Sequence, residues 1–165
     1  MKEMIIQLAG EGTIRIRLWP KIAPIACASI KKIADKGKYD HQPIQRLEPE
    51  FVIQPLFQDG LDPEIDELIA PEFCDREDNH RISFRRGIVA MAGTADQASG
   101  SQYFICLKAE ERLNGHFTVI GEVIDGWDAI ERLAQVEVTA HLDPESGRTY
   151  HVPRDPQIIE RVTIV

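Results

Sequence analysis

The apolar residues of this 165-residue chain follow two different patterns. Residues 13–18 alternate apolar with polar or charged positions, which is the period of a strand that buries one face. An apolar run at 4–8 and the turn signal Gly10-Glu11-Gly12 precede them, so the pattern predicts an N-terminal β-hairpin. Further along, residues 103–107 form an uninterrupted apolar run of strand-forming side chains.

The start of this second run is the first candidate for a binding site. Residues 93–99 are small and mostly polar, and Gly100 and Ser101 are turn residues. The strand is therefore expected to begin after them, which places the amide of Gln102 beside aromatic residues at the junction of loop and strand. Apolar walls with a few fixed hydrogen-bonding groups are typical of a small-ligand or peptide site.

Other short apolar runs predict further strands. They carry few charges and are bounded by turn residues. They are residues 44–47 and 51–54, joined by a proline-containing turn, 82–91, interrupted at Gly87, 117–124, and the closing run 158–165.

Two helices are predicted between these strands. The first covers about residues 24–36, since Pro24 can occupy a first helical turn and Gly37 can end the helix. The second follows Asp125, a good N-cap, and has an apolar face over residues 127–134. Many short strands and two separate helices favour a mainly β fold, either an antiparallel barrel or a sandwich, whose open ends the helices cover.

Length and charge narrow the class of protein. The length favours a single domain over residues 1–165. A net charge of −8 and a pI near 5.1 argue against a nucleic-acid binder. The lysine cluster at 31–38 lies in and just after the first predicted helix, where cations suit the helix dipole. No secretory signal and no apolar stretch of roughly 18 residues is seen, so neither export nor a membrane span is expected. Three scattered cysteines fit the reduced thiols of the cytoplasm.

Metal and thiol chemistry receive little support. Residues 55–80 carry many carboxylates, but the Asp-x-Asp-x-Asp-Gly pattern of a calcium loop is missing, so a solvated acidic loop is expected. The five histidines show no metal-ligand spacing. Cys106 with His116 is a conceivable nucleophile and base, but a cysteine in a buried strand is inert.

Motifs along nearly the whole chain match one family in order. The most specific is Gly100-Ser101-Gln102-Tyr103-Phe104-Ile105, which is similar to the family signature Gly-Ser-Gln-Phe-Phe-Ile. The others are Ala23-Pro24, Tyr39-Asp40, Arg46, Pro49, Phe51, Gln54, Glu72-Phe73, Leu113-Asn114-Gly115 and Val119-Ile120-Gly121-Glu122-Val123. The chain thus resembles the cyclophilins, which are peptidyl-prolyl cis-trans isomerases, and in particular a divergent, single-domain, bacterial-like member. The resemblance implies a mainly β fold, a closed eight-stranded antiparallel β-barrel capped by two α-helices.

The resemblance also implies a site and its partners. Arg46 takes the position of the family's catalytic arginine. The substrate-binding positions fall on apolar residues that hold the proline ring and on groups that hold the peptide backbone: Phe51, Val52, Phe104, Leu113 and Phe117 for the ring, and Gln54, Gln102, Ala92 and Gly93 for the backbone. No cofactor and no metal are expected. The expected partners are proline-containing peptides and unfolded or flexible protein segments, and the protein is expected to be a cytoplasmic monomer.

The chemistry of these residue types agrees with that activity. An Xaa-Pro bond rotates slowly because partial double-bond character gives a barrier of ~18–20 kcal/mol. In the twisted transition state the prolyl nitrogen carries a lone pair, which a permanently charged donor such as Arg46 stabilises. No nucleophile, metal or proton relay is required.

Several positions depart from the family pattern. Pro55-Leu56-Phe57 replaces Gly-Gly-Asp, which predicts a different loop path over the site. Val52 stands for methionine, Gly93 for asparagine, Phe117 for histidine and Arg112 for tryptophan, and the last change predicts weak binding of cyclosporin. Two hypotheses follow: an active prolyl isomerase acting as a folding helper, or a module that binds proline-containing segments or a partner protein without useful catalysis.

Overall fold

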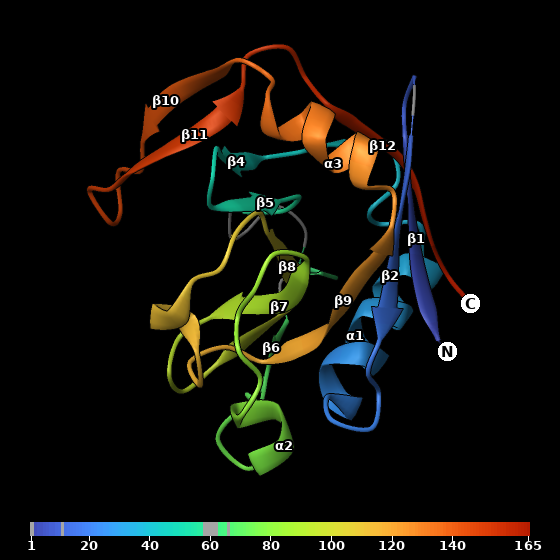
Figure 1. Cartoon of the computed structure of the whole chain (residues 1–165), viewed down its shortest axis with the longest axis vertical. Helices are drawn as coiled ribbons and strands as arrows, with labels where there is room; N and C mark the ends of the chain where they lie inside the picture. Colours follow the sequence, from blue (N-terminus) through green and yellow to red (C-terminus); the bar gives the residue numbers. More distant parts are fainter. Residues whose placement is uncertain (1, 11, 58–62, 66) are drawn as a thin grey trace.

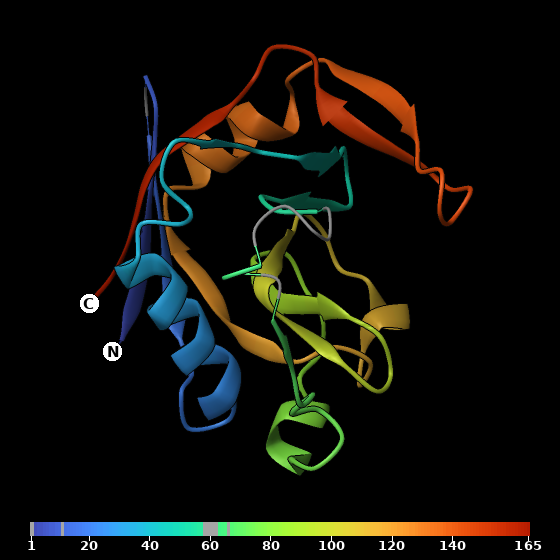
Figure 2. The same ribbon diagram turned by 180° about the vertical axis from the view of Figure 1, so that it is seen from behind.

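The computed structural model describes residues 2–10, 12–57, 63–65 and 67–165, which form a curled antiparallel sheet flanked by helices (Figure 1, Figure 2). The chain ends lie side by side, because β1 pairs with β12. The elements in chain order are β1 (Glu3–Leu8), β2 (Thr13–Leu18), α1 (Pro24–Asp35), β3 (Gln42–Pro43), β4 (Arg46–Glu48), β5 (Val52–Gln54), β6 (Leu68–Ile69), α2 (Glu77–His80), β7 (Ile88–Gly93), β8 (Ala98–Cys106), the 3-10 helix η1 (Glu111–Leu113), β9 (Val119–Asp125), α3 (Trp127–Ala134), β10 (Val138–Leu142), β11 (Thr149–Pro153) and β12 (Ile158–Ile164).

The main sheet curls until its two ends meet in one stretch of chain. Its strand order is β3-β12-β1-β2-β9-β7-β8-β5-β4, with β6 paired to β8. The end strands β3 and β4 belong to the same segment, residues 42–48, in which Ile44 N donates to Gln157 O (2.8 Å) and Gln45 N to Pro55 O (3.0 Å). The prediction of a mainly β fold of antiparallel strands is confirmed. The strand number differs from the predicted closed barrel of eight strands. Ten of the described strands form this sheet, and β10 and β11 form a separate two-stranded sheet.

The N-terminal hairpin follows the predicted alternation. Ile14, Ile16 and Leu18 of β2 are buried, whereas Thr13, Arg15 and Arg17 between them are exposed. One face of β2 therefore contributes to the core, and the other face meets solvent.

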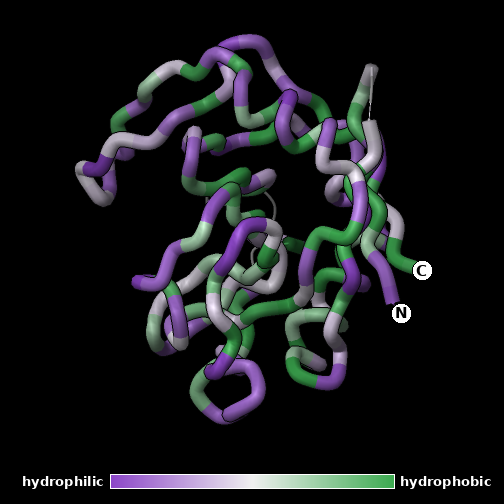
Figure 3. The backbone as a smooth tube through the Cα atoms, in the orientation of Figure 1, coloured by the Kyte–Doolittle hydropathy of each residue, from purple (hydrophilic) through white to green (hydrophobic). Residues whose placement is uncertain are grey.

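Strands β5, β7 and β8 are instead buried on both faces. Ile53, Val89 and Ile105 belong to the main core, which α1 and α3 also share. Their strand neighbours point to the opposite side and, together with residues from β9, η1 and the segment before β7, form a second group, here called the outer cluster. Its members are Val52, Phe84, Ile88, Ala90, Phe104, Cys106, Leu113 and Val119. Burial of both faces explains the uninterrupted apolar runs at residues 88–92 of β7 and 103–106 of β8. Figure 3 shows this hydrophobic character recurring along the strands, whereas the α2 segment at the bottom is mainly hydrophilic.

Helix α1 begins and ends close to the predicted positions. Pro24 occupies its first turn, as predicted, and Ile30 and Ile33 are buried. Its first turn is capped by a residue far away in the sequence. The buried carboxylate of Glu72 accepts hydrogen bonds from Ile25 N (3.1 Å) and Ala26 N (2.9 Å). The sequence showed Glu72 as part of a motif but gave no sign of this capping role.

Helix α3 forms as predicted, but its N-cap differs. Gly126 is the N-cap residue, with φ 90°, and Asp125 ends β9 and accepts a hydrogen bond from Gly126 N (2.8 Å). A Cβ atom at position 126 would lie 2.1 Å from Thr13 O. The close approach of β2 therefore requires glycine here, and it displaces the cap expected at Asp125.

Two strand boundaries also differ from the sequence prediction. Strand β8 starts at Ala98, so Gly100 and Ser101 lie inside the strand and not in a turn. A Cβ atom at position 100 would lie 2.7 Å from Ser29 Oγ and 2.9 Å from Glu67 O, which shows that this glycine permits close packing. Strand β7 starts at Ile88, directly after Gly87, where the sequence suggested a strand from residue 82.

The segment interpreted as an acidic loop contains structure in its described part. It includes β6 and α2, and Glu64 and Glu67 form ion pairs with Lys38 (2.9 Å) and Lys32 (3.1 Å). The lysine cluster is therefore largely neutralised by this segment. Asp59, Asp62 and Asp66 lie outside the described residues. Within the described ranges, His, Cys, Asp and Glu side chains form no group that could hold a metal ion, and no helix is long and apolar enough to cross a membrane.

The hairpin β10–β11 is the largest element that the sequence did not predict. The sequence indicated only a polar loop at residues 143–147, which proves to be the turn of this hairpin. Both views show the hairpin reaching beyond the curled sheet on the side of β4 (Figure 1, Figure 2). It brings β11 next to β4, the strand that carries Arg46.

Candidate functional site

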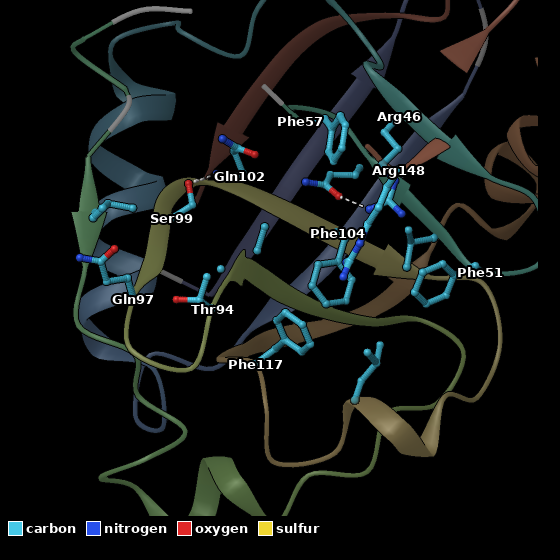
Figure 4. Close-up of a pocket in the computed structure, with 16 residues that line it drawn as sticks. Arg46, Phe51, Phe57, Thr94, Gln97, Ser99, Gln102, Phe104, Phe117 and Arg148 are labelled. Atoms are coloured by element: carbon cyan, nitrogen blue, oxygen red, sulfur yellow. Dashed lines mark hydrogen bonds between the residues drawn. The ribbon is translucent and has the colours of Figure 1, made fainter. Parts of the chain in front are cut away.

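A cavity of about 520 Å³ opens on the outer face of the sheet (Figure 4). It contains every site residue predicted from the sequence. Its lining residues are Arg46, Phe51, Val52, Gln54, Phe57, Leu68, Ala92, Gly93, Thr94, Gln97, Ser99, Gln102, Phe104, Leu113, Phe117 and Arg148.

Strand register explains why residues from distant parts of the chain share this face. Arg46 of β4 lies directly opposite Gln54 of β5, and Ala90 of β7 lies opposite Phe104 of β8. Residues directly opposite each other in a sheet point to the same side, and so do residues two apart along a strand. Gln102, two residues before Phe104, is therefore on the same face as Arg46.

The apolar part of the cavity is built from aromatic rings. The ring of Phe104 packs edge-on against Phe117 at 5.5 Å between centroids, and Phe84 lies behind both at 6.2 and 6.4 Å. Leu113, the last residue of η1, is part of the same outer cluster. In Figure 4 the rings of Phe51, Phe104 and Phe117 surround one end of the cavity, which is an apolar surface suited to a small ring.

Arg46 is held in place at the edge of these rings. Its Nη1 donates to Gln54 Oε1 (3.1 Å) and its Nε to Glu48 Oε1 (3.1 Å). The guanidinium carbon also lies 6.0 Å from the ring centre of Phe51 and 5.0 Å from that of Phe57. A guanidinium has five N–H donors, so these two hydrogen bonds leave donors for a ligand.

The carboxylate that positions Arg46 is itself held by the hairpin. Glu48 accepts a hydrogen bond from His151 N (3.1 Å), and its Oε2 lies 2.7 Å from His151 Nδ1. Burial raises the pKa of the Glu48 carboxyl, but the hydrogen bonds from Arg46 and His151 outweigh burial, so its pKa lies below the ordinary value. Glu48 is therefore a carboxylate at neutral pH and forms a fixed counter-charge to Arg46.

The polar end of the cavity is formed by the start of β8 and the turn before it. Ser99 Oγ accepts hydrogen bonds from Gln102 N (2.9 Å) and Ser101 N (3.2 Å). Figure 4 shows Thr94, Gln97, Ser99 and Gln102 along this end. Amide and hydroxyl groups placed beside an apolar surface are suited to holding an extended peptide backbone.

The departure at Gly93 has a structural reason. The register of β7 and β8 shifts between Met91 and Gly93, and Thr94 N donates to Gln97 O (2.8 Å) across the following turn. A Cβ atom at position 93 would lie 2.3 Å from Gln97 O. The local bulge therefore requires glycine where the family pattern has asparagine.

The departure at Pro55-Leu56-Phe57 adds a wall to the cavity. Leu56 is buried in the main core, and Phe57 lines the cavity. Phe57 N donates to Gln45 Oε1 (2.8 Å), and its ring lies 4.7 Å from that of Tyr150 in β11. The loop thus joins the site to the hairpin.

The sequence did not identify six lining residues: Phe57, Leu68, Thr94, Gln97, Ser99 and Arg148. Three of them lie in the polar stretch between Gly93 and Gln102, which the sequence indicated only as a loop. Phe57 was noted only as a departure from the family pattern. Leu68 lies on β6 and Arg148 directly before β11, two strands that the sequence did not predict.

Thiol chemistry at Cys106 is disfavoured, as predicted. Cys106 is buried in β8, and burial together with the nearby charge of Glu110 raises the pKa of its thiol to about 12. Burial likewise raises the pKa of the Cys27 thiol to about 12. Both thiols therefore stay protonated near neutral pH, and a protonated thiol is a poor nucleophile.

Comparison with known proteins agrees with this geometry. Residues 3–163 match the family model described as "Cyclophilin type peptidyl-prolyl cis-trans isomerase/CLD". The chain is 37% identical over 129 residues to a spliceosome-associated protein CWC27 homolog of Xenopus laevis, covering 77% of this chain and 27% of that protein. It is 32% identical over 142 residues to the peptidylprolyl isomerase cyp7 of Schizosaccharomyces pombe, covering 85% and 30% respectively. The chain therefore spans about a quarter to a third of the length of these two relatives.

A shorter relative and a solved structure complete the comparison. A peptidyl-prolyl cis-trans isomerase-like 1 protein of Rhizopus delemar is 29% identical over 140 residues, covering 85% of each chain. The crystal structure of a cyclophilin type peptidyl-prolyl cis-trans isomerase of Cryptosporidium parvum, obtained in the presence of the dipeptide Ala-Pro, superimposes with a TM-score of 0.72. That structure is 22% identical and the match covers 99% of both chains, so the likeness shows a shared fold.

Proposed function

The chain belongs to the cyclophilin-type peptidyl-prolyl cis-trans isomerase family, and we propose that it catalyses cis-trans isomerisation of Xaa-Pro bonds in polypeptides, with Arg46 as the catalytic residue. The observation that carries the proposal is the position of the Arg46 guanidinium. It is fixed by Glu48 and Gln54 at the edge of an aromatic cavity large enough for a proline ring.

Each part of the cavity has a role in this reaction. The aromatic end, with Phe104, Phe117 and Leu113, holds the ring of proline. Gln102 and the backbone at residues 92–93 hold the peptide on one side of the bond, so the other side rotates against a fixed ring. Arg46 donates a hydrogen bond to the prolyl nitrogen as conjugation is lost and its lone pair develops. Because this interaction exists only in the twisted state, it lowers the barrier to rotation.

The test is cis-trans exchange in a short Ala-Pro peptide, measured by NMR. We expect Arg46→Ala to lower kcat/KM by about 100-fold or more, since one donor to a developing charge is worth this much in other enzymes. Arg46→Lys keeps the charge but loses the planar fork, so we expect an intermediate rate. Arg161→Ala, an exposed arginine of β12 outside the cavity, is the charge-matched control. Equal rates for the wild type and Arg46→Ala would contradict the proposal.

A second function is favoured by the relatives. Two of the proteins that the chain resembles are named as spliceosome-associated proteins, so a module that binds a proline-containing segment of a larger assembly is the alternative. The contact of Phe57 with the hairpin beside Arg46 also fits a site built for one particular segment. Saturable peptide binding without any acceleration of exchange would support this alternative.

The finer expectations from the sequence stay predictions. They are a role as a folding helper, a single domain, a monomer, a cytoplasmic location and a bacterial-like type, whereas the relatives reported above are eukaryotic. Light scattering of the purified protein tests the monomer. Acceleration of a proline-limited refolding reaction tests the folding role.

A further inference from the structure

The cavity is lined by two arginines with different surroundings. Arg46 forms an ion pair with Glu48 at 3.1 Å, so its charge is balanced locally. Arg112, which lies over the Phe51 ring, is balanced in the same way by Glu110 at 2.9 Å. Arg148 is exposed, lines the cavity, and has no ion-pair partner among the residues that the structure describes. The cavity therefore has one unbalanced positive charge in its wall.

The backbone of Arg148 is well positioned by the hairpin turn. Asp143 N donates to Arg148 O (2.9 Å), and Gly147 N donates to Asp143 O (2.9 Å) with Gly147 at φ 67°. The Asp143 carboxylate also accepts hydrogen bonds from Glu145 N (3.1 Å) and from the hydroxyl of Ser146. Arg148 thus extends from a structured turn.

The hairpin is attached to the cavity directly beside Arg148. Two residues further along β11, the ring of Tyr150 contacts Phe57, which lines the cavity. The next residue, His151, binds Glu48 through its backbone and its ring. Arg148 directly precedes β11, which begins at Thr149. These contacts fix the strand that follows Arg148, and Figure 4 shows Arg148 beside Arg46 at the cavity that both residues line.

We propose that Arg148 selects polypeptide segments that carry an anionic side chain, a carboxylate or a phosphate, next to the proline. This inference rests on the proposed function and specifies its substrate class. A guanidinium binds both kinds of anion through two parallel hydrogen bonds. The chain as a whole carries a net charge of −8 and repels acidic segments. A local, unpaired cation at the cavity therefore decides whether an acidic segment is accepted.

The test uses peptides that differ only in one charge. Acetylated and amidated pentapeptides with a central proline carry Glu or Gln either just before or just after the proline. For the wild type we expect kcat/KM to be three- to tenfold higher for Glu than for Gln in at least one of the two positions, the range for a solvent-accessible charged contact. The preference should shrink as salt rises from about 0.05 to 0.5 M, because added ions screen exposed charges. A phosphoserine peptide distinguishes the two anions.

Substitutions of Arg148 then show whether this residue causes the preference for Glu over Gln. Arg148→Gln should bring the Glu/Gln ratio close to one, and Arg148→Glu should reverse it. Arg161→Gln changes the net charge equally, lies outside the cavity and should keep the wild-type ratio. A wild-type ratio near one at both positions, or a preference that persists in Arg148→Gln, would overturn the proposal.

The role of Arg148 can be tested even if the isomerase proposal fails. If no peptide is isomerised, the isomerase proposal fails, and the same Glu/Gln ratio is measured as a ratio of dissociation constants by NMR titration. A binding ratio that collapses in Arg148→Gln still supports the inference, and a ratio near one in the wild type still overturns it.

Discussion

The two walls of the cavity are built in different ways. One wall consists of β5, β7 and β8, whose side chains such as Phe104 (6% exposed) and Val52 (2% exposed) are packed within the outer cluster. The other wall is the hairpin β10–β11, which forms its own two-stranded sheet. It is joined to the site by the contacts of His151 with Glu48 and of Tyr150 with Phe57.

Because of this difference, one wall determines the shape of the cavity and the other determines its charge. The strand wall cannot move without breaking the main sheet, so it fixes an apolar shape. The hairpin wall adds a cation at Arg148 and a partner for Glu48, and a few side-chain contacts hold it in place. A feature held by few contacts changes more easily between relatives than one built into the sheet. We therefore expect the strand wall to account for stability and the hairpin wall for selectivity.

The largest effect is expected from the strand wall. Phe104→Ala should lower the free energy of unfolding by about 3–5 kcal/mol, because it leaves a void behind Phe117 and Phe84. Phe57→Ala removes an aromatic side chain that is only partly buried and faces the hairpin, so it should cost about half as much or less. Urea denaturation measures both. Equal losses would show that the hairpin wall is as firmly integrated as the strand wall.

The same difference explains what the sequence could predict. Residues 88–92 of β7 and 103–106 of β8 are uninterrupted apolar runs because both faces are buried, and β2 alternates because one face is exposed. Both patterns can be recognised from a few consecutive residues. The Gly100 position was misjudged as a turn because the sequence does not show which atoms approach it, here Ser29 Oγ and Glu67 O.

In the candidate site, the sequence could predict residues that the main sheet carries. Arg46, Gln54 and Phe104 were identified through the family resemblance, and strand register places them together. The hairpin was not predictable, since β10 and β11 mix polar and apolar residues and bury almost no side chains. Its position depends on contacts with Glu48 and Phe57, which are about 100 residues earlier in the chain.

An intermediate effect is expected when the hairpin is detached from Arg46. His151→Ala removes the ring from Glu48 and keeps the backbone hydrogen bond, so Glu48 positions Arg46 less firmly. We expect kcat to fall about fivefold with little change in KM, which corresponds to about 1 kcal/mol, the net value of one hydrogen bond. His151→Asn keeps a donor and should restore most of the rate. An effect confined to KM would show that His151 acts on substrate binding.

The smallest effect concerns acid stability and follows from the pKa of Glu48. Because hydrogen bonds from Arg46 and His151 outweigh burial and hold this pKa below its ordinary value of 4.5, the folded chain favours the carboxylate more than the unfolded chain does. The resulting stabilisation is present above the unfolded pKa and is lost as pH falls through the lower folded pKa. Between pH 6 and pH 3 the wild type should therefore lose more free energy of unfolding than Glu48→Gln, by about 1 kcal/mol or less. Glu137→Gln, which removes an exposed partner of Arg154 at the base of the hairpin, is the control and should follow the wild type. Identical pH dependence of the wild type and Glu48→Gln would show that the link between the hairpin and Arg46 adds nothing to stability.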